Sequence, residues 1–126
     1  MDMKTEKARN LAYLLSEANG SRSRDVVTIA SGEGGLEAGT VLGQVTATKN
    51  YVVSPDAETA GKEGAETASA ILAYGVDATD ADVEAVVTSA DAEVKAPMLI
   101  YHASVDSAAK VTAKQTQLGL AGIKTR

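Results

Sequence analysis

The 126-residue chain contains no cysteine, no tryptophan and no phenylalanine, and its aromatic side chains are four tyrosines and His102. The absence of cysteine excludes disulfide frameworks, zinc–thiolate sites, iron–sulfur clusters and thiol nucleophiles. Small side chains such as those of alanine and valine bury little area each, so the core is expected to be thin for the chain length. A thin core favours oligomerisation, because a subunit interface buries apolar area that the monomer cannot.

Long apolar runs are also missing, and none approaches the 18 or more residues of a membrane span. The N-terminal sequence MDMKTEKARN is too polar for a signal peptide. The sequence therefore predicts a soluble protein that is made in a cytoplasm and has no membrane partner. The net charge of −5 argues against a nucleic-acid partner.

The charge is distributed unevenly along the chain. Residues 1–24 contain five Lys or Arg against three acidic residues, whereas the remainder contains seven against fourteen. This distribution is compatible with a basic arm on an acidic body, and also with an ordinary scatter of surface charge. We divide the chain into an N-terminal arm, residues 1–24, and a body domain, residues 25–126.

The arm has apolar residues at helical spacing, followed by Gly20 and a polar stretch typical of a linker. The residues that share one helical face are Ala8, Leu11, Leu15 and Ala18. A single amphipathic helix must dock on something or fray. We therefore expect an arm whose order depends on a partner.

The body has mostly the period of β-strands. Strands are expected at 26–30, 36–46, 51–53, 68–76, 83–88, 94–102 and 122–124, with a polar loop at 54–66. Glycines inside the 36–46 pattern, Gly39 and Gly43, indicate a bend, a bulge or a close backbone approach. One helix is expected at 107–118, capped by Ser104 or Asp106 and ended by Gly119. The predicted fold class is a β-rich α+β domain with a C-terminal helix.

Residues that could carry chemistry are few, and each has a structural explanation that we favour. The glycine-rich segment 32–35 lacks the Lys-Ser/Thr of a phosphate-binding loop, and no helix pattern follows it. The carboxylates of the 77–84 segment do not match a calcium-binding loop. Glu33 and Glu37 could act as a carboxylate pair, but no apolar pocket is indicated around either.

His102 is the single histidine, and Ser104 and Asp106 follow it closely. Members of a catalytic triad are usually brought together by the fold rather than by adjacency in sequence, so a structural or surface histidine is favoured. The four tyrosines lack the basic neighbours of a platform for single-stranded nucleic acid. We expect no catalytic residue, no metal site, no cofactor and no enzymatic activity.

Several segments together resemble phage head decoration proteins of the lambda D-like family. The segments LLSEANG (14–20) and SRDVVTI (23–29) resemble the start of these proteins, and GLEAGTVLG (35–43) resembles their first core hairpin. The segments ASAIL (68–72) and VDA (76–78) resemble the central strand, and LGLAGI (118–123) resembles the C-terminus. The order and spacing of the segments, over nearly the whole chain, carry the resemblance.

This resemblance implies a small β-clip-like domain that binds as a homotrimer to the outer surface of an expanded capsid, at three-fold positions. The domain would clamp neighbouring capsomers against the pressure of packaged DNA, with the major capsid protein as its partner and the virion as its location. In this family the N-terminal arm orders on the capsid. The corresponding arm residues here are Leu11, Tyr13, Leu14, Leu15, Arg22 and Arg24.

The arm departs from the lambda member of the family, whose arm is rich in Ser, Thr and Pro. Three arrangements therefore stay open: addition as a strand to a capsid sheet, docking of a helix through Leu11, Leu14 and Leu15, and packing of a helix on its own body. Two other function classes are alternatives: a trimeric β-scaffold enzyme such as a nucleotide hydrolase, and a surface glycan-binding module. Neither has supporting motifs, because convergent acids and exposed aromatic side chains are not indicated.

Overall fold

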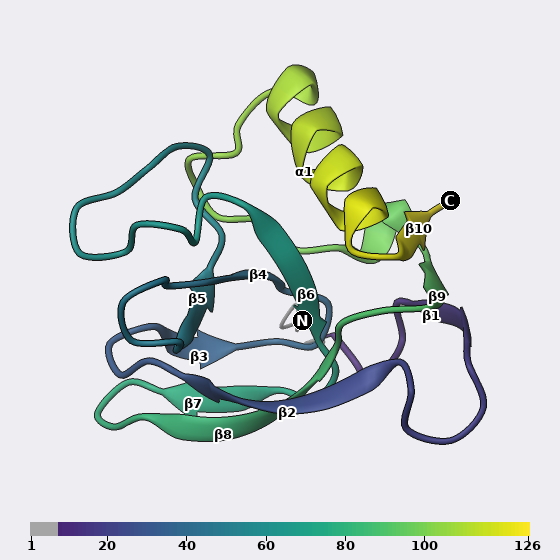
Figure 1. The fold of residues 1–126 in the computed structure, drawn as a ribbon, viewed down its shortest axis with the longest axis horizontal. Coiled ribbons are helices and arrows are strands. Elements are labelled where there is room, and N and C mark those ends of the chain that lie inside the picture. The colour runs from purple at the N-terminus through teal and green to yellow at the C-terminus, as the bar shows by residue number, and fades with distance from the viewer. Residues whose placement is uncertain (1–7) are drawn as a thin grey trace, which may run out of the picture.

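Ten short strands, one 3₁₀ turn and one α-helix make up the part of the chain that the computed structural model describes, residues 8–126 (Figure 1). The strands are β1 (Leu14–Glu17), β2 (Arg24–Ile29), β3 (Gly34–Leu36), β4 (Val41–Gln44), β5 (Tyr51–Val53), β6 (Ala68–Leu72), β7 (Val76–Ala78), β8 (Val83–Thr88), β9 (Ala92–Val94) and β10 (Ile123–Thr125). The 3₁₀ turn η1 covers Ala96–Met98, and the helix α1 covers Ala108–Leu120. This arrangement confirms the predicted β-rich α+β class with one C-terminal helix.

Five strands close into a barrel in the order β2-β5-β4-β6-β8. The β-branched residues of β2 and β8 suit this arrangement, because their side chains alternate between the barrel interior and its outer surface. The pair β3 and β7 forms a separate two-stranded sheet. A core cluster of small and medium apolar side chains joins the barrel strands to β7, and its buried members are Ile29, Leu42, Ala70, Leu72, Ala78, Ala85 and Val87.

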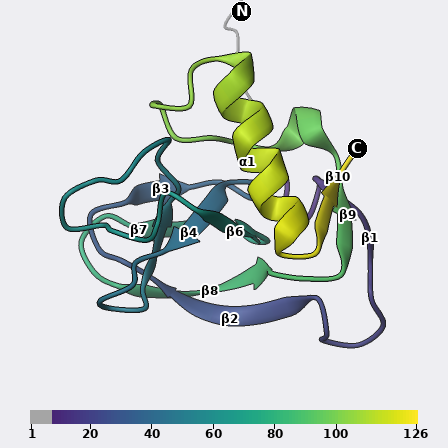
Figure 2. The ribbon, with the colours of Figure 1, turned by 45° about the horizontal axis from the view of Figure 1, so that its top comes forward.

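A second core lies between the barrel, α1 and a three-stranded sheet of order β1-β9-β10 (Figure 2). In that sheet β1 runs antiparallel to β9, and β10 runs parallel to it. The helix α1 packs against β6 and β10. The buried members of this core are Tyr13, Val41, Ala68, Ile71, Val94, Leu99, Leu118 and Ile123.

Gly43 lies where the backbone of β4 comes very close to the loop that precedes β6. A Cβ atom at Gly43 would lie 2.1 Å from the carbonyl oxygen of Ala65, so only glycine fits without a shift of the backbone. The β4–β6 register also shifts between Leu42 and Gly43. The expectation of a bulge or close approach at this glycine is therefore confirmed.

The helix α1 begins and ends at different residues from those expected. Its N-cap is Ser107, whose side chain accepts a hydrogen bond from the Lys110 backbone, rather than Ser104 or Asp106. The helix continues through Gly119 to Leu120. The chain turns at Gly122, whose φ of 92° is a left-handed conformation that glycine adopts easily. The short final strand that the sequence predicts follows as β10.

The helix expected around residues 8–18 is wrong, because Leu14–Glu17 forms strand β1. Leu11 has a φ of 60°, which is incompatible with a right-handed helix at this position. Pairing with β9 gives the backbone of β1 its hydrogen bonds, and Leu14 packs against the core beneath α1. Residues 1–7 of the expected arm lie outside the described residues.

The strand expected at 94–102 is also wrong over most of its length. β9 ends at Val94, and Pro97 lies in the first turn of η1, where its missing N–H is tolerated. The long strand expected at 36–46 is likewise divided into β3 and β4, and the one at 68–76 ends at Leu72. Among residues 8–126 we find no helix with the length and apolar character needed to span a membrane.

Candidate functional site

The segment from Leu11 to Arg24 holds all six residues that the sequence singles out for partner contact. Its strand β1 is an edge strand of the three-stranded sheet, and β9 is its only neighbour in that sheet. The register of β1 against β9 shifts between Leu14 and Ser16. This bulge places Leu15 outside the regular alternation of the strand.

Tyr13 is buried, with 1% of its surface exposed, and it belongs to the core beneath α1. Its hydroxyl lies 2.7 Å from Thr88 Oγ1 on β8. Burial raises the pKa of Tyr13 to about 12, because the phenolate is poorly solvated there. In this conformation the side chain anchors the segment to the barrel and is closed to a partner on the surface.

The three leucines of the segment differ in exposure. Leu11 is half-buried, and its backbone N–H donates to the Ala73 carbonyl at 2.9 Å. Leu14 packs against the core beneath α1. Leu15 is 48% exposed, which is unusual for a large apolar side chain in a folded domain. Of the three, Leu15 is therefore the side chain most open to a partner.

The two arginines also differ. Arg24 lies at the start of β2 and is held by Glu17, with which it makes an ion pair at 2.7 Å, and by the Tyr74 hydroxyl at 3.2 Å. This hydrogen bond to Glu17 raises the pKa of the Arg24 guanidinium above its ordinary value. Arg22 has 72% of its side chain exposed and lies 3.6 Å from an oxygen of Asp91. Leu15 and Arg22 thus present an apolar and a cationic side chain to solvent.

Three exposed apolar side chains were not singled out from the sequence, and one of them is Met98 of η1, which is 38% exposed. Val26 is 67% exposed in the middle of β2, and Leu120 is 87% exposed at the C-terminal end of α1. A signal for Leu120 exists in the sequence, since it does not share the face of α1 that carries the buried Leu118. Val26 gives no such signal, because a β-branched residue is expected on either face of a strand.

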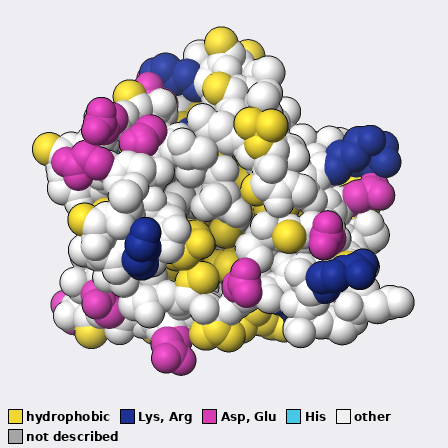
Figure 3. Space-filling model, in the orientation of Figure 1, with side chains coloured by type: hydrophobic (Ala, Val, Ile, Leu, Met, Phe, Trp, Pro, Cys, Tyr) yellow, Lys and Arg dark blue, Asp and Glu magenta, His cyan; other side chains and the backbone are white. Residues whose placement is uncertain are grey.

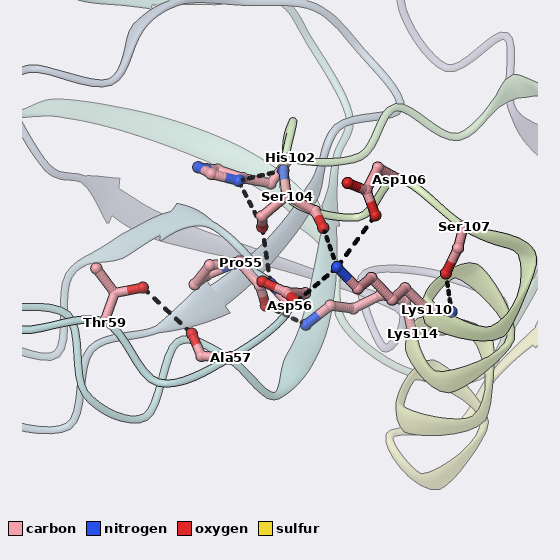
Figure 4. Close-up of polar contacts among 10 residues, drawn as sticks. All are labelled: Pro55, Asp56, Ala57, Thr59, His102, Ser104, Asp106, Ser107, Lys110 and Lys114. Atoms are coloured by element: carbon pink, nitrogen blue, oxygen red, sulfur yellow. Dashed lines mark hydrogen bonds and ion pairs between the residues drawn. The ribbon is translucent and has the colours of Figure 1, made fainter.

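The structure does bring His102 and Ser104 together, but not as a catalytic pair (Figure 4). The Ser104 Oγ lies 2.8 Å from His102 Nδ1, and the Ser104 N–H donates to the same nitrogen at 3.0 Å. Asp106 does not contact the histidine in these interactions; it pairs with Lys110 at 3.0 Å. The arrangement is a local turn in the segment that precedes α1, and it lacks the hydrogen-bonded nucleophile, base and acid of a catalytic triad.

A buried lysine beside this turn was not anticipated. Lys114 of α1 is 2% exposed, and its ammonium donates to the Pro55 carbonyl at 2.5 Å (Figure 4). The same ammonium donates to Ser54 Oγ at 2.9 Å and to the Glu66 carbonyl at 2.5 Å. Desolvation lowers the pKa of Lys114 from its ordinary value. Because these oxygens lie at the two ends of the 54–66 loop, the lysine joins both ends of the loop to the helix.

Glu33 and Glu37, the candidate carboxylate pair of the sequence, each accept hydrogen bonds that hold the structure together. Glu33 accepts hydrogen bonds from the Val53 N–H at 2.8 Å and from Lys62 Nζ at 3.0 Å. Glu37 accepts from the Ala8 N–H instead of pairing with Glu33. Among residues 8–126 no group of three or more His, Asp or Glu side chains could hold a metal ion. The glycine-rich segment 32–35 leads into β3 rather than into a helix.

Comparison with known proteins agrees with the resemblance noted from the sequence. The family model of bacteriophage lambda head decoration protein D matches residues 3–123, which is nearly the whole chain. A search of curated proteins finds no match. Head decoration proteins are structural components of the phage capsid. The chain therefore belongs to the family of the bacteriophage lambda head decoration protein D.

Proposed function

We propose that this protein binds as a homotrimer to the outer surface of the expanded capsid, at three-fold positions, and clamps neighbouring capsomers against the pressure of packaged DNA. The observation that carries the proposal is the family match over residues 3–123. The partner is the major capsid protein, and the protein is made in the host cytoplasm before it joins the virion. It acts by binding and has no enzymatic activity.

The N-terminal region, residues 1–24, makes the capsid contact in this proposal. Within its described part the contact is carried by Leu15 and Arg22, whose side chains face solvent, while Tyr13 and Arg24 hold the region on the body. An exposed apolar side chain and an exposed cation in the same segment suit a docking surface that has an apolar centre and a polar rim. The edge of β1 that faces away from β9 has no strand beside it among residues 8–126, and it offers further backbone groups for a capsid strand.

The test is co-sedimentation of the purified protein with expanded capsids. Deletion of residues 1–24 is a poor test, because it removes β1 and the core residue Tyr13. Leu15→Ser and Arg22→Glu change only exposed side chains and are the better variants. Their matched controls are Leu120→Ser and Lys49→Glu, which change an exposed leucine and an exposed lysine outside the region.

The full-length protein and both controls are expected to bind saturably. Leu15→Ser and Arg22→Glu are expected to weaken binding at least about tenfold, which corresponds to a loss of about 1.4 kcal/mol. Absence of saturable binding by the unaltered protein would overturn the proposal, and a screen of nucleotide substrates would then be justified. Equal binding by all four variants would move the capsid contact to another part of the body.

A further inference from the structure

The turn between β1 and β2 carries the dipeptide Asn19-Gly20 at its tip. The chain has three asparagines, Asn10, Asn19 and Asn50, and only Asn19 precedes a glycine. Residues 19–22 are all exposed. Figure 3 shows the turn as a projecting corner at the lower right, where uncharged surface lies beside cationic side chains. Asparagine is a thermolabile residue, and this one is open to water.

Hydrogen bonds fix the base of this turn but not its tip. At the base, the Ala18 N–H donates to Ser23 Oγ at 2.9 Å. At the tip, neither the side-chain amide of Asn19 nor the N–H of Gly20 has a hydrogen-bond partner among residues 8–126. A segment with few hydrogen bonds and full exposure opens at little cost in free energy. The Asn19 amide and the Gly20 nitrogen are therefore both free to react with each other.

Gly20 also leaves the approach of its nitrogen unhindered. A side chain on the residue that follows an asparagine obstructs contact between its backbone nitrogen and the asparagine amide carbon, and glycine has no side chain. Gly20 has a φ of 70°, and no atom lies within 4 Å of the position that a Cβ would take. The surroundings of this nitrogen are therefore open on that side.

The other two asparagines lack this combination. Asn10 is followed by Leu11, whose N–H is occupied by the Ala73 carbonyl at 2.9 Å. Asn50 is followed by Tyr51, which has a large side chain and begins strand β5. Both residues therefore serve as controls within the same chain.

We propose that Asn19 is a site of spontaneous deamidation, which adds a negative charge to the turn that presents Arg22. The Gly20 nitrogen attacks Cγ of Asn19, so that a new C–N bond forms and the Cγ–Nδ2 bond breaks. The proton of the Gly20 N–H leaves with the departing ammonia, and a cyclic imide remains. Water then adds to either carbonyl of the imide and opens it to aspartate or isoaspartate. The sum is one water consumed and one ammonia released, without an oxidant or a reductant.

The new carboxylate alters the charge around the proposed capsid contact, and this consequence rests on the proposed function. Arg22 lies three positions after Asn19, and its Nε is 3.6 Å from an oxygen of Asp91. A carboxylate at position 19 adds an acidic group to the same turn and lowers the positive potential that Arg22 presents to a partner. We expect capsid binding to weaken about threefold, because interactions between exposed charges are small.

Tandem mass spectrometry of the incubated full-length chain tests the chemistry. At mildly alkaline pH, Asn19 should convert at least about tenfold faster than Asn10 and Asn50, because only its neighbour lacks a side chain. Isoaspartate should accumulate together with aspartate, since both arise from the imide, and the ammonia released should match the Asn19 converted. The folded chain should react within about threefold of the synthetic peptide SEANGSRSR, residues 16–24, because the fold leaves the tip of the turn free.

Capsid sedimentation tests the consequence. Asn19→Asp carries the charge of the product, and Asn19→Ser is its matched control, because serine is neutral and releases no ammonia. Asn19→Asp should bind expanded capsids about threefold more weakly than the fresh, unaltered chain. Asn19→Ser should bind as the unaltered chain does, and should keep its affinity through the incubation that weakens the unaltered chain. Thermal unfolding of each variant confirms that it is folded.

Three results would overturn the deamidation site: equal conversion of the three asparagines, conversion without isoaspartate, and a folded chain that reacts more than about tenfold more slowly than the peptide. Equal capsid binding by Asn19→Asp and Asn19→Ser would overturn its electrostatic consequence. Failure of the proposed function gives a different result, because the fresh, unaltered chain then does not bind capsids while Asn19 still converts.

Discussion

The guanidinium of Arg24 donates to both carboxylate oxygens of Glu17, at 2.9 Å from Nε and 2.7 Å from Nη2. The two residues are separated by the turn between β1 and β2, so this pair ties the edge of the three-stranded sheet to the barrel. Paired planar groups of this kind combine charge with a fixed direction. The Glu17–Arg24 contact therefore joins the two ends of this turn. Arg22 lies within the turn, and its side chain is exposed.

Glu17→Gln should lower the free energy of unfolding by about 1 kcal/mol at neutral pH. The hydrogen bond from Arg24 holds the pKa of Glu17 below its usual value. The stabilisation is therefore fully present above the pKa of Glu17 in the unfolded chain, about 4.3. It is lost as the pH falls through the lower pKa that Glu17 has in the folded protein. Urea unfolding at pH 7, 5 and 3.5 should show a smaller loss of stability on acidification in the variant. An identical loss in both proteins would contradict the role assigned to this pair.

Tyr13→Phe should cost about 1 kcal/mol at pH 7, because the Thr88 hydroxyl loses its buried partner. The folded pKa of Tyr13 is about 12, above the value near about 10 for an unfolded tyrosine. Its contribution to stability is thus complete below pH 10 and is lost as the pH rises toward 12. Denaturant unfolding between pH 8 and 11.5 should show this loss in the unaltered protein and a smaller loss in the variant.

The combined variant Tyr13→Phe with Thr88→Val is the control for that hydrogen bond. When both polar partners are replaced by apolar groups of similar shape, the cost should be smaller than the sum of the single changes. Additive costs would show that the hydroxyl pair contributes nothing as a pair.

Three of the barrel strands, β2, β5 and β8, were predictable from sequence, because they are runs rich in β-branched residues bounded by turn-forming residues. The segment around β1 was not, since Ala8, Leu11, Leu15 and Ala18 have helical spacing. Two tertiary features override that spacing: the left-handed backbone of Leu11 and the pairing of β1 with β9. Neither is visible in the local pattern, because the partner strand lies more than seventy residues away.

The candidate partner residues were predictable as a segment but not one by one. Leu14 and Leu15 are neighbours with the same side chain, yet one packs on the core and the other is exposed, because the strand is bulged between Leu14 and Ser16. Tyr13 is buried among core residues from several distant segments, and its hydroxyl lies 2.7 Å from Thr88 Oγ1, 75 positions along the chain. Long-range contacts of this kind determine which side chains of the segment face a partner, and the sequence alone does not contain them.

Lys114→Ala should destabilise the fold by about 3 kcal/mol, because it leaves the Ser54 hydroxyl and two carbonyls without their buried donor. The loop 54–66 should also become sensitive to trypsin at Lys62, since its two ends are no longer joined to α1. Lys110→Ala is the control, because Lys110 pairs with Asp56 and Asp106 at a partly exposed position. Limited proteolysis under native conditions measures the difference. Equal cleavage of the loop in the two variants would contradict the role of Lys114.

Gly43→Ala and Gly119→Ala should change stability in opposite directions. A Cβ at Gly43 would lie 2.1 Å from the carbonyl oxygen of Ala65, so strand β4 or the 54–66 loop must move. We expect Gly43→Ala to lower the free energy of unfolding by about 3 kcal/mol. Gly119 lies inside α1 with no atom within 4 Å of an added Cβ. Alanine there should stabilise the helix by about 0.5 to 1 kcal/mol, because it restricts the unfolded chain. Thermal unfolding of the two variants compares them directly, and a Gly43→Ala protein as stable as the unaltered chain would rule out the close approach of β4 to the loop.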